Sequence, residues 1–174
     1  MKILLKILAG LAVLALLLVI VAFFLPRQYR VERSLVFKAK PEAILAPCAD
    51  LREWRAWGVW YQRDPQLKTT YSTPPTGVGS WVSWESKQEG NGKMTMLTID
   101  PTKIVYSLEF PDFGMKSTGV MVLAPEGDGY RLTWSDEGDL GMNPMNRWVG
   151  LFLDKLIGKD FETGLVNLKK LVEK

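Results

Sequence analysis

The side chains that could act as acids, bases or nucleophiles in this chain are carboxylates, tyrosines, lysines and arginines. The sequence of 174 residues contains no histidine and a single cysteine, Cys48. Histidine is the usual general base near neutral pH and the commonest metal ligand, so catalytic triads that use it are excluded and a zinc site is not expected. A lone cysteine cannot form an internal disulfide bond. We therefore predict no metal, no cofactor and no assigned catalytic residue.

Asp136 is the carboxylate best placed for acid–base chemistry. Alternation along its strand puts Asp136 on the same side as Leu132 and Trp134. The same alternation turns Glu85 and Glu109 away from the apolar side of their strands. A buried carboxyl group with a raised pKa can act as an acid or a base. The alternative interpretation is that Asp136 is a strand-end residue hydrogen-bonded to a turn.

An apolar segment precedes the part of the chain that holds these residues. Eighteen of the nineteen residues from 7 to 25 are apolar, and Gly10 is the exception. About 20 apolar residues span a bilayer, and the segment lacks the small-residue cleavage site of a signal peptide. We predict a transmembrane anchor at residues 1–25, a linker at 26–30 and one domain at 31–174. A cleaved signal peptide and a buried helix are the alternatives.

The charges beside this segment give conflicting signals about its orientation. Lys2 and Lys6 favour a cytoplasmic N-terminus, whereas Arg27, Arg30 and Arg33 favour the reverse. A very short tail followed by a long domain is typical of a signal-anchor. We therefore predict a single-pass membrane protein with its domain on the exported, periplasmic or extracellular, side.

The charge of the domain argues against nucleic-acid binding. The whole chain carries a formal net charge of +3, and the first 25 residues contribute two lysines and no acidic residue to it. The remainder is nearly neutral, and it has no run of lysine or arginine that could follow a phosphate backbone.

The elements that would position the candidate residues are strands closed by a long helix. Residues 29–38 alternate as a strand, and a short helix begins near Pro41. A second short turn is expected at 50–54, followed by a loop at 55–65 rich in aromatic residues. Further strands are predicted at 67–72, 80–88, 93–99, 104–110, 115–123 and 130–137. Their spacing and the turns between them indicate an antiparallel meander.

A long helix is predicted from the cap at Asn143 to residue 172. Apolar residues recur at helical spacing, and their phase shifts by about one residue near Gly158. Because glycine weakens helices, we expect an irregularity there. The first part of the apolar stripe consists of Met145, Trp148, Val149, Phe152 and Leu156. We expect the whole stripe to be buried against the sheet.

The order of elements and several motifs resemble a known superfamily. The motifs are Asp50-Leu51-Arg52-Glu53-Trp54-Arg55-Ala56-Trp57, Asp64-Pro65, Thr76-Gly77-Val78-Gly79-Ser80, Trp84-Glu85, Thr133-Trp134-Ser135, Gly158-Lys159-Asp160-Phe161-Glu162, Gly164-Leu165 and Leu168-Lys169. They resemble the polyketide cyclase/dehydrase-like branch of the START-like superfamily, also called SRPBCC or Bet v 1-like, over about residues 30–172. Many members carry an N-terminal membrane segment. The resemblance implies an α+β helix-grip fold, in which a curved antiparallel sheet wraps around the C-terminal helix and encloses an apolar cavity.

Members of this superfamily bind lipids, sterols, polyketides or hormones, and a minority are enzymes. The resemblance therefore implies a membrane-anchored domain that binds a lipid or another apolar small molecule. Alternation and helical spacing select candidate cavity residues, although each of them could equally be an ordinary core residue. The candidates are Trp57, Trp60, Trp84, Met94, Met96, Tyr106, Leu108, Phe110, Met121, Trp134, Asp136, Trp148, Phe152 and Leu156.

Two other functions are consistent with the same sequence. A cyclase or dehydratase would place a polar cluster inside the cavity. A regulatory domain acting through a protein partner, whose identity the sequence does not indicate, would expose a large apolar patch and lack a cavity.

Overall fold

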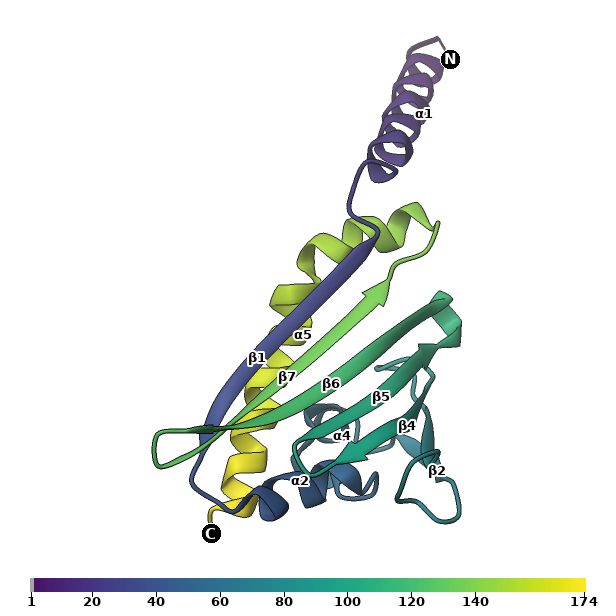
Figure 1. Cartoon of the computed structure of the whole chain (residues 1–174). Helices are drawn as coiled ribbons and strands as arrows, with labels where there is room; N and C mark the ends of the chain where they lie inside the picture. Colours follow the sequence, from purple (N-terminus) through teal and green to yellow (C-terminus); the bar gives the residue numbers. More distant parts are fainter. Residues whose placement is uncertain (1) are drawn as a thin grey trace.

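The computed structural model describes residues 2–174 and shows a seven-stranded antiparallel sheet packed on a long helix (Figure 1). The strands are β1 (Gln28–Phe37), β2 (Lys68–Tyr71), β3 (Trp81–Glu85), β4 (Gly92–Asp100), β5 (Lys103–Phe110), β6 (Met115–Glu126) and β7 (Gly129–Asp139). The helices are α1 (Lys2–Ala22), α2 (Pro41–Ala49), α3 (Trp54–Trp57), α4 (Val59–Arg63) and α5 (Pro144–Val172), with a 3-10 turn at Pro111–Phe113. The predicted α+β helix-grip architecture is confirmed.

Helix α1 projects away from one end of the sheet (Figure 1). It is long and apolar enough to cross a membrane, and of its described side chains only Ala22 is buried. After α1 the chain enters β1 at Gln28, so the strand begins within the range 26–30 that we assigned to a linker.

Alternation along the strands produces one buried face. The strand order is β1-β7-β6-β5-β4-β3-β2, so β1 and β2 form the edges. The side chains that point toward α5 from the five longest strands are mostly buried: Val31, Phe37, Met94, Met96, Ile104, Tyr106, Met121, Leu123, Leu132 and Trp134. This inner face and α5 supply most of the core.

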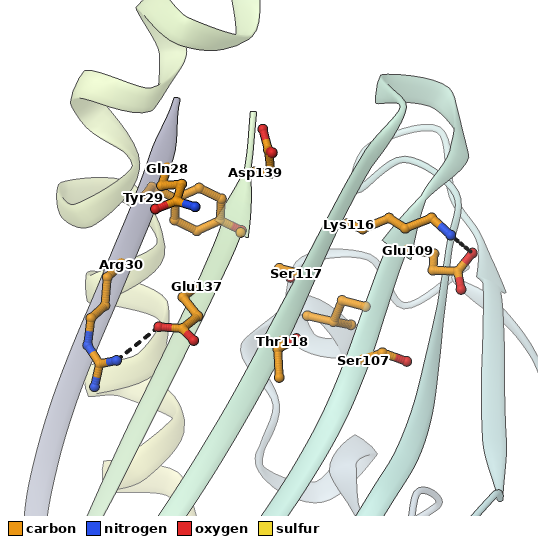
Figure 2. Close-up of a pocket in the computed structure, with 12 residues that line it drawn as sticks. Gln28, Tyr29, Arg30, Ser107, Glu109, Lys116, Ser117, Thr118, Glu137 and Asp139 are labelled. Carbon is orange, nitrogen blue, oxygen red and sulfur yellow. Dashed lines mark hydrogen bonds and ion pairs between the residues drawn. The ribbon is translucent and has the colours of Figure 1, made fainter. Parts of the chain in front are cut away.

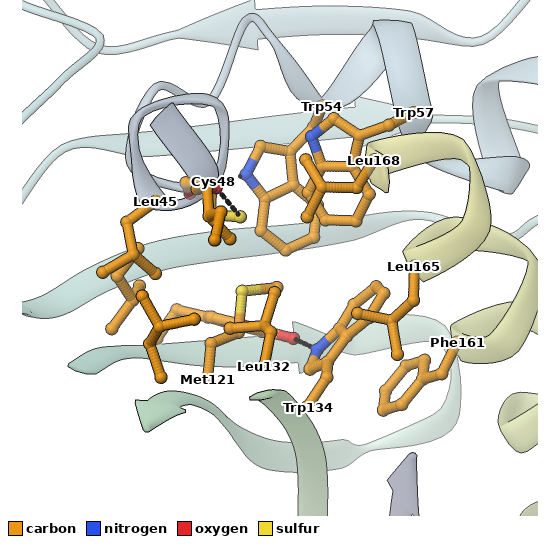
Figure 3. Close-up of a cluster of buried hydrophobic side chains, with 14 of the residues drawn as sticks. Leu45, Cys48, Trp54, Trp57, Met121, Leu132, Trp134, Phe161, Leu165 and Leu168 are labelled. Atoms are coloured by element: carbon orange, nitrogen blue, oxygen red, sulfur yellow. Dashed lines mark hydrogen bonds between the residues drawn. The ribbon is translucent and has the colours of Figure 1, made fainter. Parts of the chain in front are cut away.

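The core is built around an aromatic cluster from α3, β7 and α5 (Figure 3). The rings of Trp134 and Phe161 stack with centroids 3.9 Å apart, and Trp57 meets Trp134 edge-on at 5.3 Å. Each buried indole has an acceptor: Trp54 donates to the Cys48 carbonyl at 2.9 Å and Trp134 donates to the Tyr106 hydroxyl at 2.7 Å. Satisfied donors let these large rings be buried without an unpaired polar group.

Helix α5 is continuous, and the irregularity that we expected at Gly158 is absent. The glycine instead makes room for Arg33 of β1, because a Cβ atom at residue 158 would lie 2.1 Å from Nη2 of Arg33. The Arg33 guanidinium lies against α5 at Gly158 and donates to Asp154 at 2.9 Å and to Glu162 at 2.7 Å. The glycine therefore serves close packing between strand and helix.

Two further expectations were wrong. The segment at 55–65 is not a loop, because it contains α3 and α4, separated at Gly58. The first part of the α5 stripe is not buried: Met145, Val149, Phe152 and Leu156 are exposed, and in this part of the helix Arg147 and Leu153 are buried instead. These residues do share one side of the helix, as their spacing predicts, but the sheet does not bury their side chains.

Candidate ligand-binding site

An apolar pocket of about 480 Å³ lies between the middle of α5 and the inner face of β3, β4 and β5. We call it the inner pocket. Its wall on the sheet side includes Val82, Trp84, Met94, Leu108 and Phe110. Helices α3, α4 and α5 complete it with Trp54, Trp60, Tyr61, Leu153, Leu156, Ile157 and Phe161. Aromatic rings and methionine form a wall that accepts apolar molecules of varied shape.

A small polar cluster occupies one side of the inner pocket. Asp136 of β7 is almost fully buried, and both of its carboxyl oxygens accept hydrogen bonds. Tyr29 donates to Oδ1 at 2.8 Å, and Ser117 donates to Oδ2 at 3.0 Å. Burial raises the pKa of Asp136, and the two hydroxyl donors oppose that rise. This cluster can orient a polar group of a bound molecule or exchange a proton with it.

An ion-pair cluster around Arg63 forms another part of the inner pocket's lining. Arg63 of α4 binds Asp160 of α5 through Nη1 and Nη2 at 2.7 and 2.9 Å. It also binds Glu89 in the β3–β4 turn at 2.8 and 2.9 Å. The Glu89 and Asp160 carboxylates raise the pKa of Arg63 further above its usual range. These ion pairs therefore tie α4, α5 and the β3–β4 turn together at the pocket wall.

A second depression, of about 730 Å³, lies on strands β1, β7, β6 and β5 near their α1 end (Figure 2). Its charged residues are paired, Arg30 with Glu137, Lys116 with Glu109, and Asp139 with the neighbouring Arg27. It is shallow, and small residues such as Ser107 and Thr118 form its floor. Paired charges on an open surface recognise little, so we place the candidate site at the inner pocket.

The structure distributes the fourteen predicted residues over three environments. Eight of them line the inner pocket: Trp60, Trp84, Met94, Tyr106, Leu108, Phe110, Asp136 and Leu156. Four are packed in the core away from it, namely Trp57, Met96, Met121 and Trp134. Phe152 and Trp148 lie on the first half of α5 outside the pocket lining, and Phe152 is exposed.

Several lining residues were missed by the sequence reasoning. Val82 shares the inner side of β3 with Trp84, as alternation indicates, but it was not named among the candidates. Tyr29 was assigned both to the linker at 26–30 and to the start of the strand at 29–38, and its contact with Asp136 was not foreseen. Ile157 and Phe161 belong to the second part of the stripe that we expected to be buried but were not named as cavity residues, and Leu153 lay outside that stripe. Among residues 2–174 no group of three or more acidic or cysteine side chains is arranged to hold a metal ion.

Comparison with known protein families shows which family has this fold. Residues 28–173 match the profile of the family described as polyketide cyclase / dehydrase and lipid transport. The chain belongs to this family. The match covers all of the helix-grip domain and leaves out α1, in agreement with the superfamily resemblance. Among curated proteins, no sequence matches the chain.

Solved structures share the fold at low sequence identity. Protein Mll3558 of Rhizobium loti is 20% identical, with 83% of this chain and 96% of that chain covered and a TM-score of 0.60. The di-domain aromatase/cyclase StfQ of the steffimycin biosynthetic pathway is 12% identical, with 84% and 51% covered and a TM-score of 0.64. A norcoclaurine synthase point mutant of Thalictrum flavum, solved with a transition-state analogue, is 16% identical, with 83% and 94% covered and a TM-score of 0.61. At these identities the likeness establishes the fold alone.

Proposed function

We propose that this protein is a membrane-anchored domain that binds a lipid or another apolar small molecule in the inner pocket. The observation that carries the proposal is a pocket of about 480 Å³ with an aromatic and aliphatic wall and one buried polar cluster. Sites for apolar ligands have this character, in which apolar walls supply affinity and a few polar groups fix orientation. The family description, which includes lipid transport, supports the same conclusion.

The direct test is to identify what the protein carries. The full chain is purified in nanodiscs of one synthetic lipid after gentle extraction, and the retained small molecules are extracted and analysed by mass spectrometry. We expect a defined apolar species at close to one molecule per protein. A protein that carries nothing beyond the added lipid, and that binds no lipid or fatty-acid probe, contradicts the proposal.

Two variants on the same strand sharpen this test. Leu108→Trp places added bulk into the inner pocket, whereas Ser107→Trp places the same side chain on the opposite face of β5. Leu108→Trp should lose most of the bound species, and Ser107→Trp should keep it. Equal retention by the two variants would show that the bound molecule lies elsewhere.

Asp136 favours a second candidate function, a cyclase- or dehydratase-like enzyme. A carboxyl group buried in the pocket wall, with a raised pKa, can remove and return a proton at a carbon next to a carbonyl group. The test supplies a panel of polyketide-like β-keto thioesters to the wild type and to Asp136→Asn. Turnover that disappears in the variant while ligand retention persists would favour the enzyme. No turnover by the wild type would favour the binding role.

We further propose that α1 anchors the domain in a single pass, with the domain on the exported side. Helix α1 has the length and apolar surface for this role. Fusion of alkaline phosphatase, which is active only after export, to the C-terminus should give high activity. A fluorescent protein that folds only in the cytoplasm should be dark at the same position, and the reverse pattern would overturn this orientation.

A further inference from the structure

The first half of α5 carries an apolar face that no other described part of the protein covers. Met145, Val149, Phe152 and Leu156 follow one another at intervals of four, three and four residues and therefore share one side of the helix. Their exposed fractions are 67%, 47%, 59% and 59%. We call these four residues the α5 apolar face. Contiguous exposed apolar surface of this kind marks a contact with a protein or a membrane.

Helix α1 holds the start of α5 directly. The Arg147 guanidinium donates to the Phe23 carbonyl at 3.0 Å and to the Ala22 carbonyl at 3.5 Å, and it lies over the Phe23 ring. A cation at the carbonyl end of a helix is favourable because it complements the helix dipole. The Trp148 indole donates to the Leu18 carbonyl at 3.2 Å, about 6 Å up the α1 axis from Ala22. The first turn of α5 therefore overlaps the last turn of α1.

The strand register brings further apolar side chains to this end of the domain. Gln28 at the start of β1 pairs with Asp139 of β7, and Asp139 pairs with Lys116 at the start of β6. The β5–β6 turn therefore lies at the end of the sheet from which α1 departs. In that turn Phe113 is exposed, and its carbonyl accepts from Asn146 of α5 at 3.3 Å. Met142, which precedes α5, is exposed as well.

We propose that the α5 apolar face, with Phe113 and Met142, inserts into the interface of the same bilayer that α1 spans. The proposal rests on the anchoring role of α1. Because Trp148 reaches a carbonyl inside the apolar span, the first turns of α5 must lie at the depth where acyl chains meet headgroups. An amphipathic helix in that position buries its apolar side about 5–10 Å into the boundary. Tryptophan also favours this zone.

With the α5 apolar face in the bilayer interface, the inner pocket lies next to the lipid. Leu156 belongs both to the α5 apolar face and to the pocket lining, and Phe110 lines the pocket just before the β5–β6 turn. An opening of the pocket between these two residues would face the membrane surface. A lipid can then pass from the bilayer into the inner pocket along apolar side chains, without crossing water. The chemical class of ligand is thereby narrowed to molecules that partition into membranes.

The test measures the depth of single positions in the full chain, reconstituted at one copy per nanodisc. Cys48 is the only native cysteine and is buried, so cysteines introduced at exposed sites are labelled selectively with a nitroxide. Met145→Cys and Phe152→Cys probe the α5 apolar face. Val166→Cys, 43% exposed in the second half of the same helix, is the matched control. Leu14→Cys in α1 reports independently on the anchor.

We expect collisions with oxygen to rise and collisions with a water-soluble nickel complex to fall at residues 145 and 152, relative to residue 166. Water-exposed labels at 145 and 152, together with a lipid-exposed label at 14, would overturn this inference and leave the anchor intact. Labels at 145 and 152 shielded from both reagents would also overturn it, because they would indicate a protein contact. A water-exposed label at 14 would overturn the anchor and this inference together. Ligand retention, read by mass spectrometry, tests the binding role separately.

Discussion

Replacement of Gly158 by alanine should have opposite effects on stability in two backgrounds. In an ordinary helix interior, alanine is more stable than glycine by about 1 kcal/mol. Gly158 lies in the interior of α5, yet the space above it is filled. A Cβ atom at this residue would have the Arg33 guanidinium as its nearest neighbour, with three of its atoms at 2.1, 2.4 and 3.0 Å. Glycine therefore weakens the helix at this position but allows Arg33 of β1 to pack directly against it.

The expected magnitudes follow from these contacts. Addition of a methyl group to filled space costs about 1–3 kcal/mol, so Gly158→Ala in the wild type should lower the free energy of unfolding by about 0–2 kcal/mol after the helix gain. In an Arg33→Ala background the obstructing atoms are gone, and the same change should raise the free energy of unfolding by about 1 kcal/mol. The coupling free energy between residues 33 and 158 is the difference between these two changes in the free energy of unfolding.

The assay is urea unfolding of the full chain in detergent micelles, followed by tryptophan fluorescence and near-ultraviolet circular dichroism. All four proteins of the double-mutant cycle are measured under the same conditions. If Gly158→Ala changes stability equally in both backgrounds, Arg33 is not the reason for the glycine. Close packing between β1 and α5 would then not account for Gly158.

Other predictions concern buried polar groups. Burial raises the pKa of Asp136 above its ordinary value of 3.8, so the folded state keeps this proton to a higher pH than the unfolded chain. Stability should fall as pH rises between those two pKa values, and Asp136→Asn should gain stability relative to the wild type as pH rises above 3.8, in unfolding curves at each pH. Tyr106→Phe leaves the buried Trp134 indole without its acceptor and should cost about 1–3 kcal/mol in urea unfolding; a cost below about 0.5 kcal/mol would contradict this hydrogen bond. Burial raises the pKa of the Cys48 thiol, so a maleimide should modify it only as fast as the protein unfolds.

The strands and their inner sides could be predicted from the sequence because alternation has a period of two. Tyr106, Leu108 and Phe110 were assigned to one side of β5, and the structure places them there. How deep a side chain lies on that side was not predictable. Trp134 and Asp136 share one side of β7, yet Trp134 is packed in the core while Asp136 reaches the inner pocket. Depth depends on which residues of α3 and α5 lie opposite, and alternation carries no information about them.

Helical periodicity has a similar limit, since it identifies an apolar face without identifying what covers it. The sequence of α5 offers two apolar faces whose phases differ. Leu153, Ile157 and Phe161 face the inner pocket, whereas Met145 and Phe152 point outward. A helix that packs on a sheet and one that lies in a lipid interface bury the same kinds of side chain. The contacts of Arg147 and Trp148 with α1 place the start of α5 beside the apolar span, and the outward face is the one that stays exposed there. Near Gly158 the exposed apolar face ends at Leu156, and the apolar residues Phe161, Leu165 and Leu168 that follow are buried by protein.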